Sequence, residues 1–372
     1  MEVTALSSSG RKPSRCAFSS GPMRKLLVQY GGLCAGLLVA WGAGLIGCAT
    51  PPQPQYQPPP PVPPPEPPPP PAPVATANAM ELQRITSDSA PEFAPRISPD
   101  GTQLLFYVVD QAKVQEFSRL ASALGQPLII PDSFSVAAVS MGSSGRKLIA
   151  GPGASFASWY PDGKHIVYSY HQTAKPTLVR SPYGGVGMTF IAPSAMGETD
   201  GQAVVSPDGK RLAFHTVIGK QEHVCTVNAD GSSFTVYAPG SSPRWHPDGT
   251  VLAFHRMVGN HAQIFTIDLG SGQVTQLTTG SASSTFPVFS QDGRWVLFSS
   301  DRDGKWHIYL MKGDGSSLTQ LTKGGAEAGW PDWGADGWVY FSSNAGAPSA
   351  TGSNPWAWPF ADVWRVRPVL PE

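Results

Sequence analysis

The sequence predicts an all-β fold, a six-bladed β-propeller made of four-stranded antiparallel blades. An Asp-Gly pair followed at once by an apolar, aromatic-bearing segment occurs six times, at Asp100, Asp162, Asp208, Asp248, Asp292 and Asp336. After a first interval of 62 residues, successive aspartates lie 46, 40, 44 and 44 residues apart. A repeat of about 40–45 residues is typical of a propeller blade that is copied around a ring.

The pattern predicts four short strands in each repeat. The first strand precedes the Asp-Gly pair, as Pro243–Trp245 does, and the second follows it, as Val251–Phe254 does. The pair between them predicts a two-residue hairpin turn, since Asp and Gly tolerate the positive φ that such a turn needs. A third strand, such as Ile264–Ile267, and a fourth, such as Val274–Thr278, complete the blade. Four antiparallel strands are the unit of a propeller.

The last repeat lacks its outermost strand, because the chain stops soon after the strand Asp362–Arg367. Ahead of the first repeat, Leu82–Thr86 resembles the Gln-Leu-Thr strands that close the other repeats. We predict that this segment pairs into the last blade and closes the ring, since an open ring would expose strand edges.

The first repeat is longer than the others, and the surplus falls at 111–133. Val114, Phe117, Leu120 and Leu124 have helix-like spacing there. An insertion on one face of a repeat protein is often a binding element. A lid over an apolar blade edge is the alternative.

Residues 1–47 form a predicted signal region. Residues 26–47 are mostly apolar or glycine, Arg24 and Lys25 precede them, and Met23 is the natural start that this pattern favours. A basic segment followed by an apolar core indicates a secretory signal. Its end, from Leu45 to Cys48, resembles the bacterial lipoprotein box, which implies that Cys48 is lipidated and becomes the mature N-terminus. An uncleaved membrane anchor is the alternative.

Residues 48–80 form a predicted tether that is disordered and rich in proline. Proline dominates 51–73, and such a segment adopts an extended polyproline II conformation rather than packing as helix or sheet. A PxxP-type ligand is the alternative. In lipoproteins an aspartate after the cysteine is associated with the inner membrane, so Ala49 favours the outer membrane, with the propeller in the periplasm. Removal of the signal and lipidation of Cys48 would leave Cys225 alone, without a disulfide partner.

The composition excludes some partners. The chain has 26 basic and 26 acidic residues, a formal net charge of zero, and no basic cluster, which argues against nucleic acid as a ligand. Residues 81–372 then form one large propeller domain, which we expect to be a monomer.

The pattern Pro-x-Trp-Ser-Pro-Asp-Gly before an apolar strand resembles the WD40-like PD40 repeat of the TolB propeller family. The resemblance is best at 95–106, 243–254 and 287–298. It implies a non-catalytic periplasmic scaffold that binds proteins, as in the Tol-Pal system. TolB has an α/β domain ahead of its propeller, where this chain has the anchor and the prolines. The repeat pattern also departs from the family at Ala157, Ala203 and Gly334-Ala335.

The sequence offers little catalytic chemistry. It contains no Gly-x-Ser-x-Gly, His-Glu-x-x-His or Cys-x-x-Cys motif, and we predict no cofactor. His215 and His255 follow Leu-Ala-Phe in adjacent repeats, so they are weak candidates for a metal site. Serine holds that position in other repeats, at Ser169, Ser299 and Ser342. A polar residue that fills a strand face is therefore the competing interpretation.

Charged residues near the innermost strands are the candidate binding surface of the channel. Arg96, Arg244 and Asp332 directly follow the proline position of the repeat, while Glu92 and Asp200 lie three residues ahead of it. Solvation of a wet channel is the alternative reading. The turn aspartates are interpreted as turn-formers, and Trp159, Trp245 and Trp333 as packing between blades.

Three functions remain open at this point. The first is a lipoprotein scaffold that binds an envelope protein or a peptidoglycan-associated component. The second is a metal-dependent propeller lyase or hydrolase that acts on envelope or plant glycans. The third is a structural envelope protein without a specific ligand.

Overall fold

The computed structural model describes residues 74–75, 79–87, 91–110, 112–113, 133–143, 145–173, 176–191, 200–345 and 362–370. The predictions for the signal region, Cys48, most of the tether and nearly all of the 111–133 insertion lie outside these residues. None of the described residues form an apolar helix of the length that crossing a bilayer requires.

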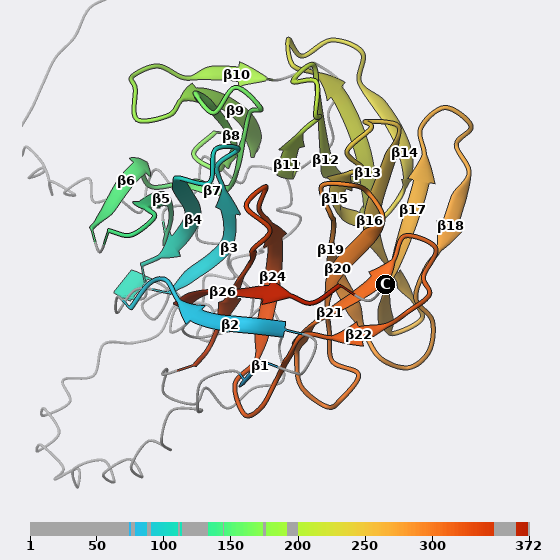
Figure 1. Cartoon of the computed structure of the whole chain (residues 1–372). Coiled ribbons are helices and arrows are strands. Elements are labelled where there is room, and N and C mark those ends of the chain that lie inside the picture. Colours follow the sequence, from blue (N-terminus) through green and yellow to red (C-terminus); the bar gives the residue numbers. More distant parts are fainter. Residues whose placement is uncertain are drawn as a thin grey trace, which may run out of the picture. The chain divides into compact units, whose positions relative to one another are not determined.

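Six four-stranded antiparallel sheets form a ring of blades (Figure 1). We number the blades 1 to 6 in chain order. Neighbouring inner strands are in contact around the whole ring, including the last with the first. The predicted six-bladed propeller is therefore confirmed. The inner strands are β3 (Glu92–Ile97), β7 (Ala154–Trp159), β11 (Asp200–Val205), β15 (Ser241–Trp245), β19 (Ser284–Phe289) and β24 (Ala328–Trp333).

The second strands are β4 (Gln103–Val109), β8 (His165–Tyr170), β12 (Arg211–Ile218), β16 (Val251–Val258), β20 (Trp295–Ser300) and β25 (Val339–Ser343). The third strands are β5 (Phe134–Ser140), β9 (Thr177–Pro182), β13 (Gln221–Asn228), β17 (His261–Asp268), β21 (His307–Lys312) and β26 (Asp362–Pro368). The outer strands are β6 (Arg146–Ala150), β10 (Thr189–Ile191), β14 (Thr235–Pro239), β18 (Val274–Gln276), β22 (Thr319–Gln320) and, in blade 6, β2 (Ala79–Arg84).

The Asp-Gly hairpins join the first and second strands of every blade. Each of the six aspartates accepts a hydrogen bond from the backbone N–H two residues later, at 2.8–3.1 Å, so the turn-forming role is confirmed. The prediction of a two-residue turn is wrong. Only the glycine has a positive φ, and its N–H donates to the carbonyl three residues earlier, which makes a four-residue turn. A proline such as Pro207 takes the second position of that turn because its φ is fixed.

A β-bulge interrupts the inner strand of each blade. In four blades a proline follows the first bulge residue, where a missing N–H breaks no ladder hydrogen bond. The first residues of the six bulges all have a left-handed φ of 50–57°, and they are Ala94, Phe156, Gln202, Ser242, Phe286 and Trp330.

The hydrophobic core lies between blades. Six clusters of buried residues each join two neighbouring blades, and a seventh, which includes Trp330, lies around the channel. The packing role of the tryptophans agrees with this arrangement. The indole N–H of Trp159 donates to the carbonyl of Arg96 in blade 1 (3.0 Å), and that of Trp245 to Val204 in blade 3 (3.1 Å).

The N-terminal strand closes the ring as predicted. In Figure 1 the blue strand β2 lies beside the red strand β26, and the two pair antiparallel. Arg84 adds an ion pair with Asp362 at 2.6 Å. The pairing starts ahead of Leu82, and a further short strand, β1 (Val74–Ala75), pairs with β23 (Thr322–Lys323) next to blade 5.

Candidate functional site

The channel has a mouth at the end where the Asp-Gly turns lie. A cavity of about 440 Å³ opens there, and all six inner strands contribute to its lining. The residue that follows the bulge lines this cavity in every blade. These six residues are Arg96, Ser158, Val204, Arg244, Val288 and Asp332. The structure thus brings together three of the five charged residues that the sequence selected.

Arg96 and Asp332 form a buried, loose ion pair between blades 1 and 6. Their side chains are 12% and 15% exposed, and the guanidinium lies 3.8 Å from the carboxylate. Burial raises the pKa of Asp332, although the positive charge of Arg96 acts in the opposite direction. Burial likewise lowers the pKa of Arg96. Both shifts mean that loss of water outweighs the attraction between the two groups.

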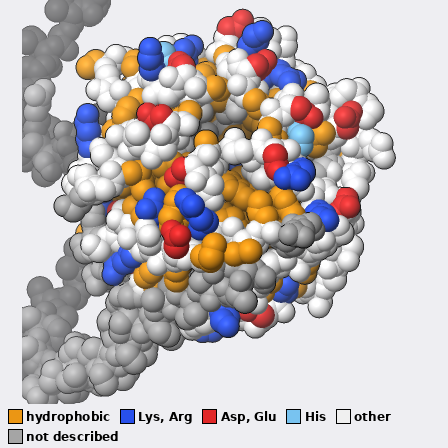
Figure 2. Space-filling view, viewed as in Figure 1, with side chains coloured by type: hydrophobic (Ala, Val, Ile, Leu, Met, Phe, Trp, Pro, Cys, Tyr) orange, Lys and Arg blue, Asp and Glu red, His pale blue; other side chains and the backbone are white. Residues whose placement is uncertain are grey.

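Arg244 lies in blade 4, across the ring from Arg96. Its side chain is half-buried at the mouth. Within the part of the chain that the structure describes, it has no hydrogen-bond or ion-pair partner. Two arginines and one aspartate line the cavity, so the mouth has a formal charge of +1. It is suited to receive an anionic group. Figure 2 shows one face of the ring, with hydrophobic side chains around the central hollow and a few charged ones beside them.

Glu92 and Asp200 are not part of the mouth. Both occupy the first position of an inner strand, whereas the mouth residues lie near the ends of those strands. Glu92 is fully buried, and its carboxylate is 3.5 Å from the guanidinium of Arg146. The side chain of Asp200 lies outside the described atoms. The periodicity placed these two residues on the correct strands but could not show at which end of the channel they lie.

A layer of bulge residues separates the mouth from the other end of the channel. The rings of Phe286 and Trp330 stack with centroids 4.0 Å apart, and Phe156 stacks on Trp330 at 5.8 Å. Blade 1 lies between the blades of Phe156 and Trp330, and its bulge residue is the small Ala94. The aromatic rings therefore meet over Ala94. On the opposite side, the hydroxyl of Ser242 donates to the amide oxygen of Gln202.

A second and larger cavity, of about 690 Å³, lies at the end of the channel opposite the Asp-Gly turns. We call it the far cleft. It is lined by blades 3, 4 and 5 and by Trp306 from the loop between β20 and β21. His255 lines it, and His215 lies close enough to affect the titration of His255. No motif in the sequence indicates this cleft, because residues from three repeats line it.

The ring nitrogens of His255 contact neighbouring protein groups, as expected of a polar residue that fills a strand face. The N–H of Phe286 points at Nδ1 of His255 (3.5 Å), so Nε2 carries the proton and donates to Ser241 Oγ (3.1 Å). In that arrangement both ring nitrogens of His255 have protein partners. Among the described residues, no group of three or more His, Cys, Asp or Glu side chains could hold a metal ion.

Comparison with known proteins gives one family match. Residues 236–350 match the TolB beta propeller domain, PD40. An uncharacterized protein of Agrobacterium fabrum (strain C58) is 36% identical over 58 residues. That match spans 16% of this chain and 18% of the relative.

Solved structures share the fold at low identity. A candidate TolB of Agrobacterium tumefaciens has a TM-score of 0.52 and 17% identity, with 66% of this chain and 90% of that chain covered. A gluconolactonase of Xanthomonas campestris also has a TM-score of 0.52, with 12% identity and coverages of 82% and 96%. A TolB-type propeller and a gluconolactonase thus share this architecture. Part of the six-bladed ring thus matches the family model of the TolB beta propeller domain.

Proposed function

We propose that this protein is a non-catalytic scaffold of the cell envelope that binds a partner at the mouth of its propeller channel. The partner is an envelope protein or a peptidoglycan-associated component. The signal region and Cys48 support a lipid-anchored protein of the periplasm, held at the outer membrane. The TolB-type repeat supports a role in binding proteins.

Arg244 is the observation that carries the proposal. A half-buried guanidinium without a partner among the described residues keeps its binding capacity for another molecule. Arginine binds carboxylates with two parallel hydrogen bonds, which adds geometric specificity. The partner therefore presents a carboxylate to the mouth, from an acidic side chain or a chain terminus.

The experiment captures partners of the full-length lipoprotein from solubilised envelopes of its own organism, after cross-linking. We expect one dominant protein with the wild type, and its loss with Arg244→Ala. Lys220→Ala is the matched control, because Lys220 is exposed on the hairpin between β12 and β13, at the other end of the channel. Recovery that is equal with and without Arg244 would contradict the proposal, and recovery of no dominant partner would favour a purely structural role.

The enzymatic alternative has its own test. A metal-dependent lyase or hydrolase would bind a metal ion stoichiometrically and lose it in the variant with both His215→Ala and His255→Ala. We expect substoichiometric metal in the wild type, measured by elemental analysis after dialysis. Stoichiometric metal that depends on the two histidines would overturn the scaffold function.

A further inference from the structure

The far cleft has the volume and the mixed polarity of a small-ligand site. Its 690 Å³ falls within the range of such sites, about 300–1,000 Å³. Its walls include the aromatic rings of Phe286 and Trp306 and the exposed side chain of Met257. The layer of bulge residues separates it from the channel mouth, so its ligand need not be the partner proposed above.

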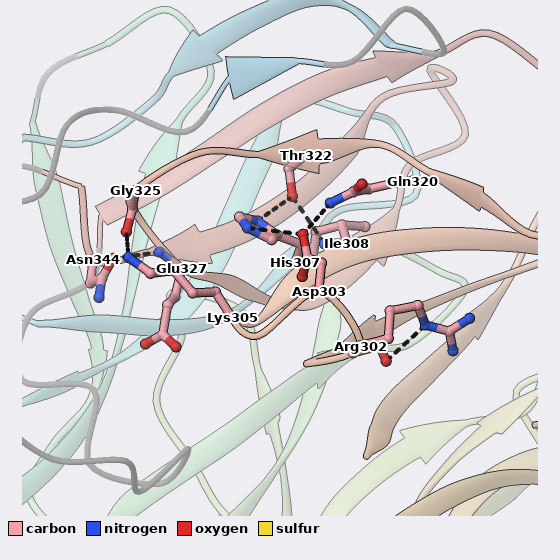
Figure 3. Close-up of polar contacts among 11 residues, drawn as sticks. Arg302, Asp303, Lys305, His307, Ile308, Gln320, Thr322, Gly325, Glu327 and Asn344 are labelled. Atoms are coloured by element: carbon pink, nitrogen blue, oxygen red, sulfur yellow. Dashed lines mark hydrogen bonds and ion pairs between the residues drawn. The ribbon is translucent and has the colours of Figure 1, made fainter. Parts of the chain in front are cut away.

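The loop that carries Trp306 is fixed on both sides of this residue (Figure 3). Asp303 accepts a hydrogen bond from the Gln320 side chain (2.7 Å) and lies 3.7 Å from Nε2 of His307. Lys305 donates to the carbonyl of Gly325 (2.7 Å). These contacts hold the backbone around Trp306 in place before any ligand arrives. Such preorganisation lowers the entropy that binding costs.

Hydroxyl groups surround the base of the cleft. Ser241, Thr285 and Ser299 line it, and Thr285 and Ser299 are cross-strand neighbours in blade 5. The side-chain oxygens of Thr285 and Ser299 are buried without a hydrogen-bond partner among the described residues. Ser241 Oγ accepts the proton of His255 Nε2, which leaves its own O–H to donate elsewhere. Buried groups of this kind need water or a ligand that offers hydrogen bonds.

The charges of the cleft argue against an anionic ligand. The lining carries two acidic side chains, Glu222 and Asp301, and one arginine, Arg256. The imidazole of His255 stays neutral at physiological pH, because burial and the nearby His215 lower its pKa to about 3. Carboxylates accept hydrogen bonds, serine and threonine hydroxyls donate and accept them, and aromatic faces pack against C–H groups.

From this combination we infer that the far cleft binds a neutral carbohydrate. The C–H face of a sugar ring packs on Trp306 and Phe286, and the hydroxyl groups on its edge bond to Glu222, Asp301 and the serines. A sugar ring combines many neutral donors and acceptors with an apolar C–H face in a small volume. The inference concerns binding alone.

The experiment measures binding of cellobiose, maltotriose and N,N′-diacetylchitobiose to the full-length protein by titration calorimetry and tryptophan fluorescence. Trigalacturonate serves as the anionic comparison. We expect saturable binding of at least one neutral sugar. Trp306→Ala and Met257→Arg should each weaken that binding at least about tenfold, the first by removing the aromatic face and the second by filling the cleft.

Matched controls separate the cleft from the rest of the fold. Val258 is adjacent to Met257 and is also exposed, but it does not line the cleft, so Val258→Arg should bind like the wild type. Ser299→Ala should weaken binding, whereas Ser342→Ala, at the same position in blade 6, should not. Arg244→Ala should also leave sugar affinity unchanged, so failure here is distinct from failure of the partner proposal.

The inference is overturned if no neutral sugar binds at millimolar concentrations, or if only trigalacturonate binds. It is also overturned if Met257→Arg and Val258→Arg bind a neutral sugar equally well. Met257 is 59% exposed, so this comparison holds even if Trp306→Ala fails to fold.

Discussion

At the residue scale, a threonine two residues after the outer strand makes the same pair of contacts, a two-point clamp, in three blades. Thr278 and Thr322 each accept, through Oγ1, the backbone N–H of an isoleucine in the third strand of their blade, both at 2.9 Å. The leucine before each threonine donates its own N–H to the carbonyl of that isoleucine at 2.8 Å. Thr86 and Ile85 repeat this geometry on Val363 in blade 6. The Gln-Leu-Thr pattern is therefore a structural signature.

Thr86→Val tests this clamp with almost no change in volume. The substitution leaves the buried N–H of Val363 without its acceptor, which costs about 1–3 kcal/mol of unfolding free energy. Urea denaturation of the variant and the wild type measures the loss. Thr275→Val is the control, since Thr275 is exposed on β18 and should change the unfolding free energy by less than about 0.5 kcal/mol. Equal losses in the two variants would contradict the role of Thr86.

His255 couples stability to pH. Its pKa is about 3 in the folded protein, because of burial and then the proximity of His215, against about 6.5 for an unperturbed histidine. Above about pH 6.5 both states are neutral. Below that value the unfolded state takes up the proton first, so the unfolding free energy falls by up to about 1.4 kcal/mol per pH unit.

We therefore expect His255→Gln to lose less unfolding free energy than the wild type between pH 7 and about pH 4.5. Urea denaturation at the two pH values gives the difference. Burial also lowers the pKa of His215, so the variant keeps part of the pH dependence. Parallel losses in the variant and the wild type would show that His255 does not titrate in this way.

At the scale of the element, the Asp-Gly turn requires a left-handed φ at its glycine. Gly163 has a φ of 63°, and a Cβ at this position would meet no atom within 4 Å. Gly163→Ala thus isolates the backbone strain, about 1–2 kcal/mol of unfolding free energy. Gly151→Ala is the control, because that site is equally open but has no left-handed φ. It should be neutral or slightly stabilising. Thermal denaturation measures the effect, and equal decreases in the melting temperature of the two variants would contradict this explanation.

Repeated residues explain why the blades could be predicted. Each Asp-Gly pair marks a hairpin that local chemistry forms wherever it occurs. The only sequence signal near the bulge is its proline, as at Pro243, which four blades have. The left-handed residue varies among the blades, from Ala94 to Trp330. Nothing in the sequence marks it, because the ladder on both sides imposes its conformation. The far cleft was missed for a related reason, since it is built where unlike loops of three blades meet.

At the scale of the whole molecule, the clusters between blades make the ring a cooperative unit. Each buries residues from two neighbouring sheets, so no blade has a complete core of its own. The ring also explains why three of the predicted binding residues line the same cavity. Arg96, Arg244 and Asp332 come from three blades far apart in sequence. They line one cavity because each repeat contributes one such residue to the channel mouth.

Closure by β2 makes the ring depend on residues ahead of the first blade. A chain that begins at residue 88 lacks β2, the ion pair of Arg84 with Asp362, and the clamp of Thr86 on Val363. It also exposes the edge of β26. We expect this chain to lose more unfolding free energy than the roughly 0.5–3 kcal/mol that a typical substitution costs. Its thermal transition should also be broader. A chain that begins at residue 79 keeps these contacts and lacks only β1, so it should melt near the parent. If calorimetry gives the two truncated chains the same thermal transition, the stability of the ring does not depend on β2.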